Sequence, residues 1–268
     1  MCRVLGVSRS GDYRWSRRTR PSAREVADGE LVALIQEIHE DSRHTYGSPR
    51  VHHELKRRGV TASMDRVARL MRQHGIRGRV RRRYRATTDS NHRRPVAANL
   101  LGREFEQEVP DSAWCADITS IATASGWVYL AAVIDLATRM VVGWSMATHM
   151  RTELVVHALE NALATRDPAP SMIHHSDRGS QYASGDDQRL LEAKGITCSM
   201  SRKGDCWDNA VMESFFGTYK QECAHVARWQ GLDDARRATV DYIDVFYNRK
   251  RLHSSLGYRT PAEADAVS

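Results

Sequence analysis

The sequence lacks long apolar runs and closely spaced cysteines. No uninterrupted apolar stretch of the 268-residue chain approaches the roughly 20 residues that a membrane-spanning helix needs. The first ten residues contain no apolar segment typical of a secretory signal. The five cysteines are widely separated and form no C-x-x-C motif. These absences argue against a disulfide framework and a cysteine zinc cluster, and they predict a cytoplasmic protein with no membrane partner.

Positive charge is concentrated in the first hundred residues. The whole chain has 40 Lys and Arg against 33 Asp and Glu, a formal net charge of +7. Residues 1–100 hold 23 Lys and Arg but only 10 Asp and Glu, whereas residues 101–268 hold 17 and 23. The first part is therefore suited to binding a polyanion, and the second part is acidic enough to hold cations.

Residues 27–76 show the apolar periodicity of three short helices joined by tight turns. We expect Asp28 to cap the first helix and Ser63 to cap the third. Opposite its apolar face the third helix carries a row of arginines spaced by three, namely Arg66, Arg69 and Arg72. This pattern predicts a helix-turn-helix region that binds DNA. The alternative is an ordinary three-helix bundle with a solvated arginine face.

Two further segments flank this region. Residues 1–26 are expected to form a partial N-terminal helical segment, and residues 77–105 a basic linker. Six arginines fall within residues 77–85 without an apolar period, and Arg81, Arg82 and Arg83 are candidates for contacts to DNA phosphates.

Residues 106–225 alternate between strand and helix patterns. Three consecutive segments rich in β-branched and aromatic residues are followed by the order helix, strand, helix, strand, helix. This order predicts a mixed α/β layer fold. Residues 226–268 are expected to form a C-terminal helix, Leu232–Tyr247, and a basic tail that includes Arg251.

Three acidic residues lie where this fold could bring them together. Asp117 lies within the first strand, Asp177 follows a later strand, and Glu213 lies one turn into a helix predicted at Asn209–Cys223. Ligand sites in α/β sheets are common at strand ends, and a few carboxylates are sufficient to bind Mg²⁺. Each acid alone would more often be structural, but the three together predict a two-metal site for phosphoryl transfer.

Four residues of the predicted helix Asn209–Cys223 lie on one face of it, at spacings of four, four and three. They are Asn209, Glu213, Gly217 and Lys220. On this face Glu213 would point toward a metal ion and Lys220 toward a phosphate. His175, two residues before Asp177, could be a ligand or base, but we expect it to support the site through hydrogen bonds, and we expect a supporting role for Asn209 as well.

Several strings of the sequence resemble one protein family. WCADITSI, HHSDRGSQYAS, SMSRKGDCWDNAVMESFFGTYKQE and YNRKRLHSSLGYRTPAE are similar to the OrfB transposases of bacterial insertion sequences of the IS-three type. YGSPRVHHELKRRG resembles the helix-turn-helix region of that family. The resemblance implies an RNase H-like DDE core of the kind found in retroviral integrases. It also implies that Asp117, Asp177 and Glu213 are catalytic and bind metal, and that Lys220 contacts DNA.

The resemblance further implies an activity and its partners. The expected reaction is cleavage at the ends of an insertion sequence and transfer of the 3′-hydroxyl strand to a DNA phosphodiester, with two Mg²⁺ or Mn²⁺ ions. The expected partners are the element ends, the target DNA, further copies of the chain on DNA, and an upstream-frame product or fusion. The implied location is the nucleoid of a bacterial cytoplasm. Two alternatives stay open: a catalytically silent repressor derived from a transposase, and an RNase H-type nuclease that cuts without joining.

Overall fold

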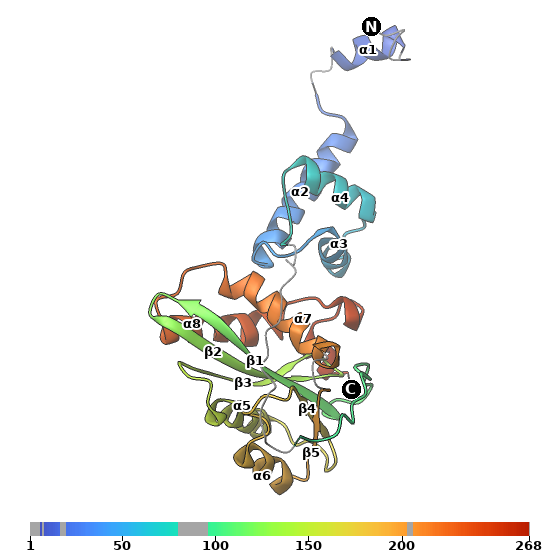
Figure 1. The fold of residues 1–268 in the computed structure, drawn as a ribbon. Helices are drawn as coiled ribbons and strands as arrows, with labels where there is room; N and C mark the ends of the chain where they lie inside the picture. The colour runs from blue at the N-terminus through green and yellow to red at the C-terminus, as the bar shows by residue number, and fades with distance from the viewer. Residues whose placement is uncertain (1–5, 7, 17–19, 80–95, 203–205, 268) are drawn as a thin grey trace. The chain divides into compact units, whose positions relative to one another are not determined.

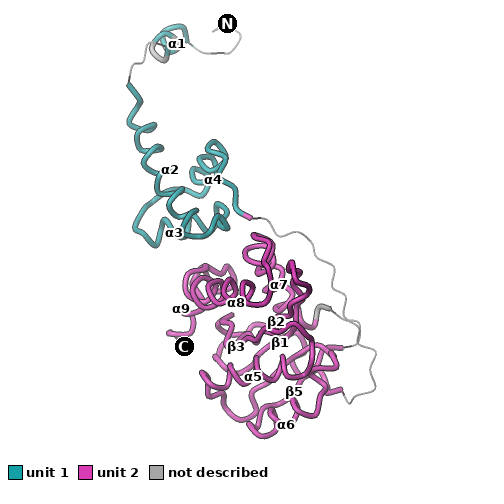
Figure 2. The backbone as a smooth tube through the Cα atoms, turned by 90° about the vertical axis from the view of Figure 1, so that its left-hand side faces the viewer, with its two compact units in different colours: residues 1–78 teal, residues 79–268 magenta. Residues whose placement is uncertain are grey.

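The chain forms two compact units, residues 1–78 and residues 79–268 (Figure 2). The computed structural model describes residues 6, 8–16, 20–79, 96–202 and 206–267. The predicted phosphate contacts Arg81, Arg82 and Arg83 lie outside these ranges. Within them, none of the helices combines the length and apolarity needed to cross a membrane.

The first unit is all-helical. Its helices are α1 (Arg9–Ser16), α2 (Ala23–Asp41), α3 (Ser48–Arg57) and α4 (Met64–Gln73). The predicted cap of the third bundle helix is confirmed, because the Ser63 hydroxyl accepts the Arg66 amide at 3.3 Å. The prediction that Asp28 caps the first bundle helix, α2, was wrong. Ser22 and Glu25 form a capping box that starts α2 six residues before Asp28.

Helices α2, α3 and α4 enclose a small apolar core, and ion pairs link their outer faces. The Arg58 guanidinium, at the end of α3, contacts Glu37 and Asp41 of α2 at 2.7 Å each and Glu54 at 3.1 Å. The buried side chains of the core are Leu31, Ile35, Ile38, Val51, Leu55, Val67, Leu70 and Met71.

The second unit is built on a five-stranded sheet in the order β3-β2-β1-β4-β5 (Figure 1). The strands are β1 (Ala113–Thr123), β2 (Gly126–Asp135), β3 (Val141–Ala147), β4 (Ile173–Ser176) and β5 (Thr197–Met200). β1, β2 and β3 pair antiparallel, whereas β4 pairs parallel with both β1 and β5. The predicted RNase H-like mixed sheet, preceded by an all-α region, is confirmed.

Helices cover both faces of the sheet (Figure 1). α5 (Thr152–Thr165) and α6 (Gly185–Ala193) lie on one face, and α7 (Ala210–Tyr219) and α8 (Leu232–Val240) lie on the other. α5 approaches β3 very closely at Gly143, where an added Cβ would lie 2.3 Å from the Ala158 carbonyl oxygen. Glycine at this position therefore lets the helix lie directly on the strand.

The two long helices predicted near the C-terminus are each divided. A 3₁₀ turn (Cys206–Asn209) precedes α7, and a π-helical segment (Lys220–Ala224) follows it. α8 likewise continues into the π-helical segment Asp241–Tyr247. Apolar periodicity extends across these boundaries, so it could not indicate the change in helix type. A short 3₁₀ helix (Ser254–Leu256) and α9 (Pro261–Asp265), which was not predicted, complete the unit.

The π-helical segment after α7 is held by a buried ion pair. Arg251 binds both carboxylate oxygens of Glu222 at 2.8 Å, and the Tyr242 hydroxyl donates to the same carboxylate at 2.8 Å. Arg251 is buried, so it does not belong to an exposed basic tail as the sequence suggested. Its charge is instead matched inside the fold by an acid 29 residues earlier in the chain.

Candidate active site

The three predicted acids come from neighbouring elements of the second unit. The parallel register of β1 and β4 pairs Ala116 with Ser176, so Asp117 and Asp177 each follow a paired residue on adjacent strands. Glu213 lies in the first turn of α7, and α7 packs against β1. The structure therefore brings Asp117, Asp177 and Glu213 to one region of the sheet.

The pKa of Asp117 responds to the charges of the other two acids. Burial raises the pKa of the Asp117 carboxyl well above its usual value, and the charges of Asp177 and Glu213 raise it further. The Ile118 amide and the Lys220 ammonium lower this pKa, but they do not reverse the shift. An acid in this position is costly to ionise without a cation.

Local turns fix the orientation of two of the carboxylates. Asp117 Oδ1 accepts the Ile118 amide at 2.7 Å, and Asp177 Oδ1 accepts the Gly179 amide at 2.8 Å. A Cβ added at Gly179 would lie 2.8 Å from that same Asp177 oxygen. Glycine at this position thus allows the turn to close onto the Asp177 carboxylate.

This donor set fits a hard divalent cation in its chemistry. All three side chains offer oxygen, which Mg²⁺ and Mn²⁺ prefer, and their mutual repulsion is relieved by positive charge. Across the described ranges, no three His, Cys, Asp or Glu side chains already stand in an arrangement that would hold a metal ion. The charges of Asp177 and Glu213 act on Asp117, but the three carboxylates do not form a finished metal site and would have to converge around a cation.

Lys220 lies beside this cluster. It is only 8% exposed, at the start of the π-helical segment, and its charge acts on Asp117. The structure thus places Lys220 against the carboxylates rather than on an open surface. Its predicted contact with DNA stays a prediction.

His175 and Asn209 connect the cluster to the turn before α7. The His175 ring bonds the Ser199 hydroxyl through Nδ1 at 2.9 Å, and the Asp208 carbonyl oxygen lies 3.0 Å from its Nε2. Burial lowers the pKa of His175 and so favours the neutral ring. The Asn209 side-chain amide donates to the Ala116 carbonyl at 3.4 Å, next to Asp117. The supporting roles of His175 and Asn209 stay predictions.

Sequence reasoning missed the main charge contact of this turn. The buried Asp208 carboxylate accepts from Arg103 and Arg202 at 2.8 Å each and from Asn99 at 2.9 Å. The Arg202 guanidinium holds the pKa of Asp208 well below its usual value. Arg103 is 105 residues away in the sequence, so no local spacing could have indicated this pair.

The predicted DNA-binding arginines of α4 are not all directed to solvent. Arg66 and Arg69 bind the two oxygens of Asp28 in α2, at 2.7 and 2.8 Å. Arg72 is exposed on the last turn of α4. The arginine row is thus divided between a contact within the bundle and one exposed cation, and its contact with DNA stays a prediction.

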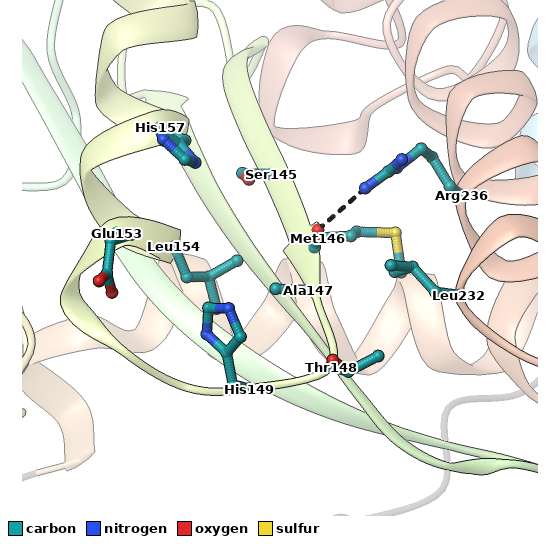
Figure 3. Close-up of a pocket in the computed structure, with 10 residues that line it drawn as sticks. All are labelled: Ser145, Met146, Ala147, Thr148, His149, Glu153, Leu154, His157, Leu232 and Arg236. Carbon is teal, nitrogen blue, oxygen red and sulfur yellow. Dashed lines mark hydrogen bonds between the residues drawn. The ribbon is translucent and has the colours of Figure 1, made fainter.

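A cavity of about 420 Å³ lies elsewhere in the second unit, between the end of β3, the start of α5 and α8 (Figure 3). Arg236 crosses it to donate to the Met146 carbonyl at 3.2 Å (Figure 3). His149, Glu153 and His157 also line it. It contains none of the predicted site residues, so the acidic cluster remains the best candidate for the chemistry.

Comparisons with known proteins agree with these features. Residues 107–206 and 194–261 match two family models described as integrase core domain, and residues 26–84 match an HTH-like domain. The solved structures that resemble the chain include the simian T-cell lymphotropic virus intasome in complex with PP2A regulatory subunit B56 gamma. That match has 15% identity and a TM-score of 0.48, and it covers 86% of this chain and 73% of the other.

Curated relatives match nearly the full length. The chain is 45% identical over 262 residues to the insertion element IS600 uncharacterized 31 kDa protein of Shigella sonnei, covering 98% of this chain and 96% of that protein. It is 40% identical over 264 residues to transposase InsF for insertion sequence IS3A of Escherichia coli (strain K12), covering 98% and 92%. With an integrase core, an HTH-like domain and these relatives, the chain belongs to the IS3 family of bacterial insertion-sequence transposases.

Proposed function

We propose that this transposase cleaves the ends of its insertion sequence and transfers the resulting 3′-hydroxyl strand to a phosphodiester of target DNA, with Asp117, Asp177 and Glu213 as its catalytic residues. The observation that carries the proposal is that β1, the end of β4 and α7 bring these three carboxylates to one region of the sheet, where the other two acids raise the pKa of the half-buried Asp117. Gathering like charges in a half-buried site is costly, and a bound cation would offset that cost.

The three carboxylates would hold two Mg²⁺ or Mn²⁺ ions. Asp117, on which the charges of both other acids act, would contribute to both ion sites, with Asp177 completing one and Glu213 the other. When bound, such ions supply Lewis-acid activation of the attacking and leaving oxygens. Lys220 adds a positive charge beside Asp117 and would orient the reacting phosphate.

DNA is the partner that this proposal requires. The HTH-like region of residues 26–84 would bind the element ends, with the exposed Arg72 among its phosphate contacts. Because two ends must be held together during transfer, we expect more than one copy of the chain on DNA. An upstream-frame product or fusion is a further proposed partner for recognition of the ends.

The decisive experiment incubates the purified chain with labelled element ends, target plasmid and MgCl₂, and separates joined, cut and unreacted DNA. Glu213→Gln should lower both cut and joined products by about a hundredfold or more while retaining the gel shift. Glu192→Gln, an exposed acid on α6, is the matched control and should react like the wild type.

Each alternative gives a different result. A repressor would shift the DNA without cutting it, and a nuclease would cut without joining. Undiminished cleavage by the Glu213→Gln variant would refute the assignment of that residue.

A further inference from the structure

Three polar side chains are buried between β4, α6 and the loop that joins them. His174, Tyr182 and Asp187 are 1%, 2% and 1% exposed. His174 Nε2, Tyr182 Oη and Asp187 Oδ1 have no hydrogen-bond partner among the described residues. Buried polar atoms in folded proteins are nearly always hydrogen-bonded, so three such atoms in one place call for a functional or structural reason.

Tyr182 is tied to the turn that holds Asp177. Gly179 donates its amide to the Asp177 carboxylate, and its carbonyl accepts the amide of Tyr182 at 3.1 Å. On the other side, the Gln188 side chain of α6 donates to the Tyr182 carbonyl at 3.0 Å. The ring lies against His174, with centroids 6.4 Å apart. The backbone therefore fixes the tyrosine in relation to Asp177 before any ion binds.

The charges of three acids act on the Tyr182 hydroxyl. Burial raises the pKa of Tyr182 well above its usual value, and the charges of Asp117, Asp177 and Asp187 raise it further. A tyrosine hydroxyl is protonated at neutral pH in any case, so it is available as a hydrogen-bond donor. Two of these three acids, Asp117 and Asp177, are proposed metal ligands.

We propose that Tyr182 is a positioning residue of the active site, whose buried hydroxyl donates a hydrogen bond to the Asp117–Asp177 carboxylate pair once that pair has converged around divalent cations. This inference rests on the proposed function of the carboxylates. Residues that hydrogen-bond to metal ligands orient those ligands, and removing them commonly weakens metal binding by about 10- to 100-fold. Among the described residues of the cation-free protein the hydroxyl has no partner, so no hydrogen bond between these residues is lost when it is removed.

Tyr182→Phe tests this inference, with Tyr219→Phe as the matched control. Tyr219 is also fully buried, but its hydroxyl already bonds the Thr239 hydroxyl at 2.6 Å. We would titrate the full chain with MnCl₂ by calorimetry and measure thermal unfolding without divalent ions. Tyr182→Phe should bind Mn²⁺ about tenfold more weakly and unfold no earlier than the wild type. Tyr219→Phe should show the reverse pattern, with unchanged Mn²⁺ affinity and earlier unfolding.

Two outcomes overturn the inference: wild-type Mn²⁺ affinity in Tyr182→Phe, or earlier unfolding of that variant in the absence of ions. An Asp177→Asn arm separates this result from a failure of the proposed function. If Asp177→Asn retains both Mn²⁺ binding and strand transfer, the carboxylate site itself is wrong. If Asp177→Asn loses both while Tyr182→Phe behaves as the wild type, only the role of Tyr182 is refuted.

Discussion

Asp187 is an acid whose ionisation the fold opposes, and its replacement gives a quantitative test of the structure. It lies in the first turn of α6, where the Ser184 hydroxyl accepts its amide, yet its carboxyl is 1% exposed. Burial raises the pKa of this carboxyl from 3.8 to about 7. Between these two values the folded protein binds a proton that the unfolded chain has released. Stability therefore falls as the pH rises through this window.

The size of the effect follows from the shift. A pKa shift of one unit corresponds to about 1.4 kcal/mol of unfolding free energy. Roughly two pH units of the range between the unfolded and folded pKa values lie above pH 5. Between pH 5 and pH 8 the wild type should therefore lose about 3 kcal/mol of unfolding free energy that Asp187→Asn retains. The wild type and Asp187→Asn share all other titrating groups, including His174. The difference between their unfolding free energies therefore reports on Asp187 alone. Asp186→Asn, the exposed neighbour on the same helix, controls for the loss of a first-turn charge.

The assay is urea unfolding of wild type and both variants at pH 5 and pH 8, followed by far-UV circular dichroism. The stability advantage of Asp187→Asn over the wild type should grow with pH, while that of Asp186→Asn should not. An advantage of equal size at both pH values would mean that the Asp187 carboxyl is hydrated in solution, and the reasoning from its burial would be refuted.

Three further predictions concern other parts of the chain. Gly143→Ala should destabilise the second unit by about 1–3 kcal/mol in urea unfolding, because the new methyl group would overlap the Ala158 carbonyl oxygen. Unchanged stability would mean that α5 lies farther from β3. Arg251→Met should lower the unfolding free energy by about 3–5 kcal/mol in the same assay, since it leaves the buried Glu222 carboxylate without its cation. Unchanged stability would mean that the ion pair is hydrated in solution. Arg72→Ala should lower the salt slope of DNA binding by about one, measured by fluorescence anisotropy from 50 to 200 mM salt; an unchanged slope would place the contact elsewhere.

Local patterns in the sequence were sufficient for most elements. Ser63 could be identified as a cap from its position before an apolar period, and the structure has its hydroxyl on the expected amide. The alternation of strands and helices after residue 106 was enough to predict the mixed sheet. The acids were recognisable because a charged residue in a buried strand and another at a strand end are unusual in the same domain.

Contacts between distant residues could not be predicted in the same way. Asp28 was interpreted as a cap because its own neighbourhood allowed it, but its partners Arg66 and Arg69 are about 40 residues away. Asp208, which pairs with Arg103, is likewise 105 residues away from it in the sequence. Tyr182 gave no signal either, because an aromatic residue in a loop is usually a packing residue. Its proposed role depends on a hydroxyl that has no hydrogen-bond partner among the described residues, which only the three-dimensional structure shows.

The energy that assembles the acidic cluster comes from outside the cluster. Carboxylates repel one another, so Asp117, Asp177 and Glu213 cannot gather by their own interactions. Pairing of β1 with β4 places the first two side by side, and the buried apolar face of α7 places the third. The ion pairs of Asp208 fix the turn that leads into α7. Because these supports do not depend on the acids, substitutions such as Glu213→Gln should remove activity without loss of the fold, and the cation-free protein can fold before it binds metal.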